Sequence, residues 1–184
     1  MSHSDELWQE YHPNGEPIQG TGHPKSHFET THPSAICDTV HIWLYRDGKT
    51  GRELLFQHRS ATVTYAPNTW DISAAGHINL GESRSQAALR EAHEEIGAHL
   101  DPKKLRFVFS YKFPGSHAIH SVYLYDYTGQ PTDFHFNDSE VSDLKWVPLS
   151  SLHTFIKKGG VKPILASLDF YWHLLQKHLD YHEN

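Results

Sequence analysis

The chain has 184 residues, enough for one folded domain with a full hydrophobic core. Its net charge of −6 argues against a nucleic-acid polymer as partner, and no apolar run is long enough to predict a membrane span. The first residues lack a signal sequence and Cys37 is the only cysteine, so we expect a cytoplasmic protein without an internal disulfide.

Residues 1–34 are predicted to form an N-terminal arm or hairpin that packs on the core. The stretch EYHPNGEPIQG is typical of two short strands joined by an Asn-Gly turn. The remaining residues, 35–184, are expected to form the main domain.

The main domain alternates strand patterns with helical patterns. Strands are expected at 38–46, 52–59, 70–76, 104–113, 120–128 and 142–148. Helices are expected at 83–96, 148–160 and 161–181, the last of them a long amphipathic C-terminal helix. Strands interrupted by one helix and closed by another indicate an α/β sandwich, with a helix on each side of a mixed sheet.

The helix expected at 83–96 carries three glutamates within about one turn, Glu91, Glu94 and Glu95. At about 100° per residue they cover an arc of roughly 100° beside the apolar stripe, so they border the core. Carboxylates at this spacing repel one another, whereas Mg²⁺ prefers carboxylate oxygens as ligands. Taken alone, the pattern leaves a solvated surface and a cation site both open.

The residues around these glutamates follow a fixed spacing. Five residues separate Gly76 from Glu82, and seven residues separate Glu82 from the segment Arg90-Glu91-Ala92-His93-Glu94-Glu95-Ile96-Gly97-Ala98. This spacing resembles the signature box of the Nudix hydrolases, and the flanking sequence is similar to the branch containing isopentenyl-diphosphate isomerase. The resemblance implies a Nudix-type α/β/α sandwich and hydrolysis of a small-molecule diphosphate.

The resemblance also implies roles for individual residues in the box. Glu91, Glu94, Glu95 and the carbonyl of Ala75 would bind Mg²⁺ or Mn²⁺, and such ions lower the pKa of an attacking water. Supporting roles are implied for the residues that hold the loop and helix in place, which are Gly76, Glu82, Arg90 and Gly97.

Residues outside the box complete the predicted site. Glu140, in a polar loop, is expected as a further catalytic acid, acting with Glu91, Glu94 and Arg90, either as a metal ligand or as the base that activates water. Its alternative is an ordinary solvated acid. Substrate contacts are expected from Arg59, His77 and an aromatic side chain, Trp70 or Tyr65.

Other functions stay open beside hydrolysis. An isomerase of this fold would need a cysteine where this chain has Ala75. A non-catalytic Nudix ligand-binding module would share the fold without the activity. The long C-terminal helix leaves an assembly role, such as a homodimer, open as well.

Overall fold

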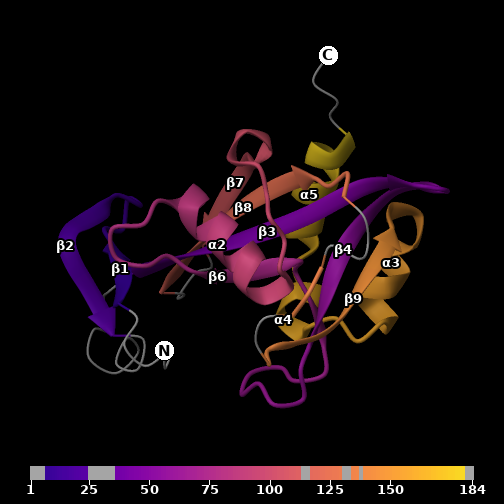
Figure 1. The fold of residues 1–184 in the computed structure, drawn as a ribbon, viewed down its shortest axis with the longest axis horizontal. Coiled ribbons are helices and arrows are strands. Elements are labelled where there is room, and N and C mark those ends of the chain that lie inside the picture. The colour runs from indigo at the N-terminus through magenta and orange to yellow at the C-terminus, as the bar shows by residue number, and fades with distance from the viewer. Residues whose placement is uncertain (1–6, 25–35, 113–116, 130–133, 137–138, 181–184) are drawn as a thin grey trace.

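The computed structural model describes residues 7–24, 36–112, 117–129, 134–136 and 139–180 (Figure 1). The predicted boundary between an arm (1–34) and a domain (35–184) falls within 25–35, outside the described residues.

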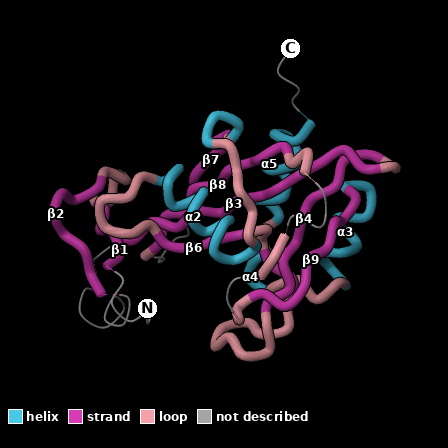
Figure 2. The backbone as a smooth tube through the Cα atoms, in the orientation of Figure 1, coloured by secondary structure: helices cyan, strands magenta, loops and turns pink. Residues whose placement is uncertain are grey.

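The described strands form one nine-stranded mixed sheet (Figure 2). In chain order they are β1 (Leu7–Tyr11), β2 (Pro17–Pro24), β3 (Ile36–Gly48), β4 (Gly51–Arg59), β5 (Trp70–Asp71), β6 (Ala74–His77), β7 (Arg106–Lys112), β8 (Ala118–Asp126) and β9 (Val141–Pro148). The predicted strand at 70–76 is thus two short strands, because β5 pairs with β4 whereas β6 pairs with β3.

Strand β3 is the centre of the sheet. It pairs antiparallel with β1, β4 and β6, and parallel with β8 along nine residues from Cys37 to Tyr45. Successive side chains of β3 point to opposite faces of the sheet, and most of them are buried because both faces are covered.

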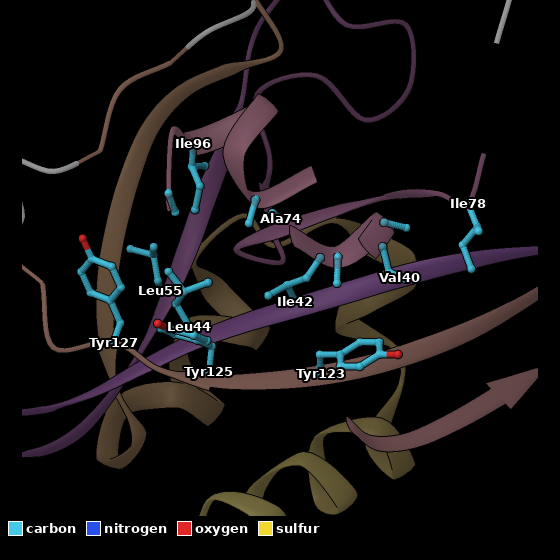
Figure 3. Packing of buried hydrophobic residues seen from close by; sticks show 14 of the residues in the cluster. Val40, Ile42, Leu44, Leu55, Ala74, Ile78, Ile96, Tyr123, Tyr125 and Tyr127 are labelled. Atoms are coloured by element: carbon cyan, nitrogen blue, oxygen red, sulfur yellow. The ribbon is translucent and has the colours of Figure 1, made fainter. Parts of the chain in front are cut away.

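Helices cover both faces of this sheet (Figure 1). They are α2 (Arg84–Ile96), the 3₁₀ turn η3 (Pro102–Lys104), α3 (Leu149–Lys158), α4 (Pro163–Ala166) and α5 (Asp169–Asp180). Ala88, Ala92 and Ile96 of α2 belong to the core cluster on one face. Figure 3 shows Ile96 on the same side of β3 as Ile42 and Leu44. The other face packs against α3, α4 and α5, so the predicted α/β/α sandwich is confirmed.

The C-terminal helix is shorter than the sequence predicts. Pro163 begins the separate short helix α4, a position that suits proline because its missing N–H needs no partner there. The Ser167 hydroxyl then donates to the carbonyl of Ile164 at 2.7 Å, which favours a turn over continued helix. Helix α5 starts afresh at Asp169, so the predicted single helix over 161–181 is broken after its first turn.

The N-terminal hairpin is tied to the core through its main chain. Strands β1 and β2 are antiparallel, and Gly15 of the predicted Asn-Gly turn has φ +86°. The backbone N–H of Gln9 donates to the carbonyl of Ile78 at 2.9 Å, and the backbone N–H of Leu80 donates to the carbonyl of Leu7 at 2.8 Å. The hairpin therefore lies against the loop that precedes α2.

None of the helices in the described ranges combines the length and the apolar character needed to cross a bilayer.

Candidate active site

Helix α2 has well-defined ends, which fix where its glutamates lie. Ser83 caps the N-terminus. Its Oγ accepts a hydrogen bond from the backbone N–H of Gln86, and the side-chain Oε1 of Gln86 accepts one from the backbone N–H of Ser83. At the other end Gly97 is left-handed, with φ +68°, and donates to His93. The predicted helix and its glycine stop are both present.

A cleft of about 530 Å³ opens beside this helix. It is lined by the three α2 glutamates, by strand β6, by the end of β4 with the loop that follows, and by the loop before β9. The residues lining it are Trp8, Arg59, Thr62, Val63, Thr64, Tyr65, Ala75, Gly76, His77, Arg90, Glu91, Glu94, Glu95, Ser139 and Glu140. Predicted site residues from four separate segments thus meet in one place.

Gly76 allows helix α2 to approach strand β6 closely. A Cβ at this position would collide with the carboxylate of Glu91. Only glycine leaves room for that carboxylate over the strand backbone, where Glu91 is also only 13% exposed.

Arg90 links the helix to the loop that precedes it. Its Nε and Nη2 donate to the two Glu82 oxygens at 2.9 and 3.0 Å, and Nη2 also donates to the carbonyl of His77 at 2.8 Å. Its Nη1 donates to Glu91 at 2.8 Å and to Glu94 at 2.9 Å. Although burial alone would lower the pKa of Arg90, these hydrogen bonds and the neighbouring carboxylates raise it, so the guanidinium stays charged.

Glu95 is the deepest of the three glutamates. Its Oε2 accepts hydrogen bonds from Gln57 Nε2 and from the Ala75 amide, both at 3.0 Å. Burial, followed by the charge of Glu91, raises the pKa of Glu95 well above its usual range. A positive ion beside Glu95 would lower its pKa again, because an opposite charge favours the ionised form.

The acidic side chains are held apart in this arrangement. Arg90 stands between Glu91 and Glu94, and Glu95 is bound to the sheet. Accordingly, no three acidic, histidine or cysteine side chains of the described part of the chain are already grouped closely enough to hold a metal. A divalent ion would compete with Arg90 for the Glu91 and Glu94 carboxylates.

The charge balance of the cleft nevertheless fits a cation. Four carboxylates line it, Glu91, Glu94, Glu95 and Glu140, against the guanidinium groups of Arg59 and Arg90. Hard oxygen donors in excess of positive charge are the chemistry that Mg²⁺ and Mn²⁺ select. The donor set therefore matches the predicted metal, while the roles of Ala75 and the individual glutamates stay predictions.

Arg59 lines the cleft and belongs to a small cationic group, while its contact with substrate stays a prediction. Its Nη1 is 3.6 Å from the buried carboxylate of Asp71, which also binds Lys162 Nζ at 2.9 Å. Arg59 Nε holds the Tyr65 carbonyl at 3.1 Å, and Lys162 lies 5.1 Å from the centre of the Tyr65 ring. Two cations share one aspartate, which leaves an excess positive charge for an anionic ligand.

Of the predicted substrate-binding residues His77 and Trp70, only His77 lines the cleft. His77 lines the cleft, with its ring stacked on Trp8 at 3.5 Å between centroids and 5° between planes. Trp70 lies outside the cleft, contrary to the expectation that it contacts substrate. It packs against His58 and Phe155, because its place opposite His58 in the β4–β5 pair points it toward α3.

Three groups at this site lie outside the set of residues that the sequence predicts. Trp8 reaches the cleft only because the hairpin docks on the loop before α2, and no local pattern marks it. Gln57 and the Asp71–Lys162 pair come from strands and loops whose contacts depend on the sheet register. An amide or a carboxylate at an otherwise apolar strand position was the only available signal.

Comparison with known proteins agrees with this geometry. The model of the NUDIX domain matches residues 36–168. An uncharacterized Nudix hydrolase of Listeria monocytogenes is 29% identical over 143 residues, covering 78% of this chain and 82% of that protein. Nudix hydrolase 3 of Arabidopsis thaliana is 32% identical over 130 residues, which is 65% of this chain but only 16% of that much longer protein.

Relatives also include isomerases. An isopentenyl-diphosphate Delta-isomerase of Cutibacterium acnes is 36% identical over 72 residues, 38% of this chain and 36% of that protein. Among solved structures, a crystal structure from Deinococcus radiodurans has a TM-score of 0.68 at 23% identity, covering 89% of this chain and 96% of that one. At that identity the structural likeness shows the fold alone.

Proposed function

Since the chain belongs to the Nudix family, we propose that it hydrolyses a diphosphate linkage in a small organic or nucleoside derivative, with Mg²⁺ or Mn²⁺ as cofactor. The observation that carries this proposal is the excess of carboxylates around Gly76 in a single cleft. Bare carboxylates would repel a diphosphate, so a substrate of that charge requires cations between them.

Each group in the cleft has a task in this proposal. Glu91, Glu94 and Glu95, with the carbonyl of Ala75, would hold the metal. When bound, the metal would lower the pKa of its bound water and offset the negative charge of the phosphates. Arg90 would keep Glu91 and Glu94 in place through its bonds to Glu82.

Two further groups would act on the substrate side. Arg59 would contact a phosphate, with its orientation set by Asp71 and the Tyr65 carbonyl. Glu140, on the loop before β9, would accept a proton from water or bind a further ion.

Isomerisation is disfavoured by the residues at the same place. The cleft presents Ala75 where a catalytic cysteine would be needed. The single thiol, Cys37, is buried in β3 opposite Ala118 and is not among the residues lining the cleft. A ligand-binding role without catalysis is disfavoured because the full set of acidic residues is present.

The test is metal-dependent release of phosphate or a phosphorylated product from a panel of diphosphate compounds, with Mg²⁺, with Mn²⁺ and with a chelator. Glu91→Gln should lower turnover by orders of magnitude, since its carboxylate is lost from the metal site. Glu53→Gln is the matched control: Glu53 is 14% exposed and binds Arg46 at 2.8 Å, as Glu91 binds Arg90, but it lies away from the cleft.

Two results would contradict the proposal. One is turnover that persists unchanged in the chelator. The other is an equal effect of the two substitutions, which would mean that Glu91 acts only as an ion-pair partner.

A further inference from the structure

The N-terminal hairpin contributes an aromatic wall to the cleft although it lies outside residues 36–168, the part matched by the family model. Trp8 of β1 lines the cleft together with the α2 glutamates. Its ring is parallel to the ring of His77 within 5°, at a centroid distance of 3.5 Å. One strand of the hairpin and one strand of the main sheet thus build a continuous stack of two flat rings.

This wall is rigidly placed. Trp8 forms a β-bridge with Asn79, and the backbone amides of the residues that follow them, Gln9 and Leu80, each donate a hydrogen bond across the same junction. The far end of the hairpin is held as well, because Arg84 Nη2 donates to the carbonyl of Gly15 at 3.1 Å while its Nε pairs with the buried carboxylate of Asp38. The hairpin that carries Trp8 is therefore anchored at both ends, and the Trp8 ring itself rests on the ring of His77 before any ligand arrives.

The remaining lining favours a flat polar group over an aliphatic one. A second aromatic ring, Tyr65, is 59% exposed on the loop after β4 and also borders the cleft. Among the described residues that line the cleft, the aliphatic side chains are Val63 and Ala75 alone. A prenyl chain would need more apolar surface than this to leave water, whereas aromatic faces beside polar side chains suit a heteroaromatic ring.

We propose that Trp8 is a specificity-determining residue, and that the Trp8–His77 stack receives a planar heteroaromatic group, such as a nucleobase, attached to the substrate phosphate. This inference rests on the proposed function for the location of the phosphate. It adds that the hairpin, together with the Nudix domain, selects what the phosphate carries.

The experiment compares two monophosphates that differ only in the attached group, AMP and geranyl monophosphate. Neither contains a diphosphate to be hydrolysed, so their binding can be measured by titration calorimetry with Mg²⁺ whether or not the protein is an active hydrolase. Wild-type protein should bind AMP more tightly. Trp8→Ala should weaken AMP binding about tenfold, the scale of one lost stacking contact, and leave geranyl monophosphate binding unchanged.

Two further variants separate stacking from folding. Trp8→Leu keeps an apolar side chain in place but removes the aromatic face, so it should also lose AMP affinity and shift the preference toward geranyl monophosphate. Leu7→Ala is the matched control, since Leu7 is the neighbouring hairpin residue, is 40% exposed and is not part of the cleft lining. It should bind both compounds as wild type does.

The inference is overturned by several results: no measurable AMP binding to wild type, AMP affinity retained in Trp8→Leu, or an equal loss for both compounds in Trp8→Ala. Failure of the proposed function looks different, because it would appear as absent diphosphate hydrolysis with the AMP preference intact.

Discussion

Replacing Gly76 by alanine tests whether the position of the Glu91 carboxylate is what the site depends on. The added Cβ would collide with that carboxylate, which is the mobile end of a side chain and can swing away. The protein should therefore fold, but Glu91 would lose its 2.8 Å hydrogen bond to Arg90 and its place over strand β6.

The stability cost follows from two opposed effects. A hydrogen bond between charged groups contributes about 1.5–3 kcal/mol, and alanine recovers about 0.5–1 kcal/mol of the conformational entropy that glycine loses on folding. The net loss is about 1–2 kcal/mol, or a decrease in Tm of about 2–8 °C for a chain of this size. Turnover should fall far more, by about 100-fold, because a displacement of about 1 Å at a catalytic group has that effect.

Gly48 offers a matched control. A Cβ there would likewise collide with the end of a glutamate side chain, Glu53, which also binds an arginine at 2.8 Å. Gly48→Ala should lower Tm by a similar amount and leave turnover unchanged. The assay is thermal unfolding together with metal-dependent hydrolysis of the best substrate found. Equal turnover in Gly76→Ala and Gly48→Ala would refute the reasoning.

Two other predictions concern single ionisable groups. Glu140→Gln should lower kcat selectively under saturating Mg²⁺, whereas Asp143→Asn, an exposed acid outside the cleft lining, should not; steady-state kinetics that show similar small effects would make Glu140 an ordinary loop acid. Burial, assisted by Lys162, lowers the pKa of His120 to about 4 from its usual 6.5, so the unfolded chain binds a proton there before the folded one does. The free energy of unfolding should therefore fall as pH decreases from about 6.5 toward 4. In urea titrations His120→Gln should reduce this pH dependence, whereas the control His173→Gln, at an exposed position, should not. Part of the pH dependence should persist in His120→Gln because the pKa of His41 is lowered as well.

The parts of the structure that the sequence predicted are those set by local rules. Ser83 and Gly97 fix the ends of α2 through capping, which needs only neighbouring residues. The strand patterns predicted the mixed sheet, the apolar periodicity predicted helix α2, and the resemblance to the Nudix box predicted the supporting roles of Gly76, Glu82 and Arg90. The break between α4 and α5 was missed because the amphipathic pattern continues through Ser167, although the backbone does not.

The parts that could not be predicted depend on contacts between distant segments. Trp8 faces His77 only because β1 docks beside residues 78–80, about seventy positions later in the chain. Trp70 was assigned to the site because aromatic residues near a predicted cleft are plausible ligand contacts, and the pairing of β5 with β4 turns it to the other face. Both placements depend on how strands pair within the sheet, and no local sequence pattern predicts that pairing.

The parallel pairing of β3 with β8 has a consequence for how this protein is made. Cys37 lies opposite Ala118, so the central strand leaves the ribosome about eighty residues before its parallel partner does. At about 5–20 residues per second the gap lasts roughly 4–16 s, during which β3 can pair with β4 across their tight turn but has one edge open. A nascent chain stalled before residue 118 should therefore be readily cleaved by protease and bound by chaperones, and one extended past β8 should resist both.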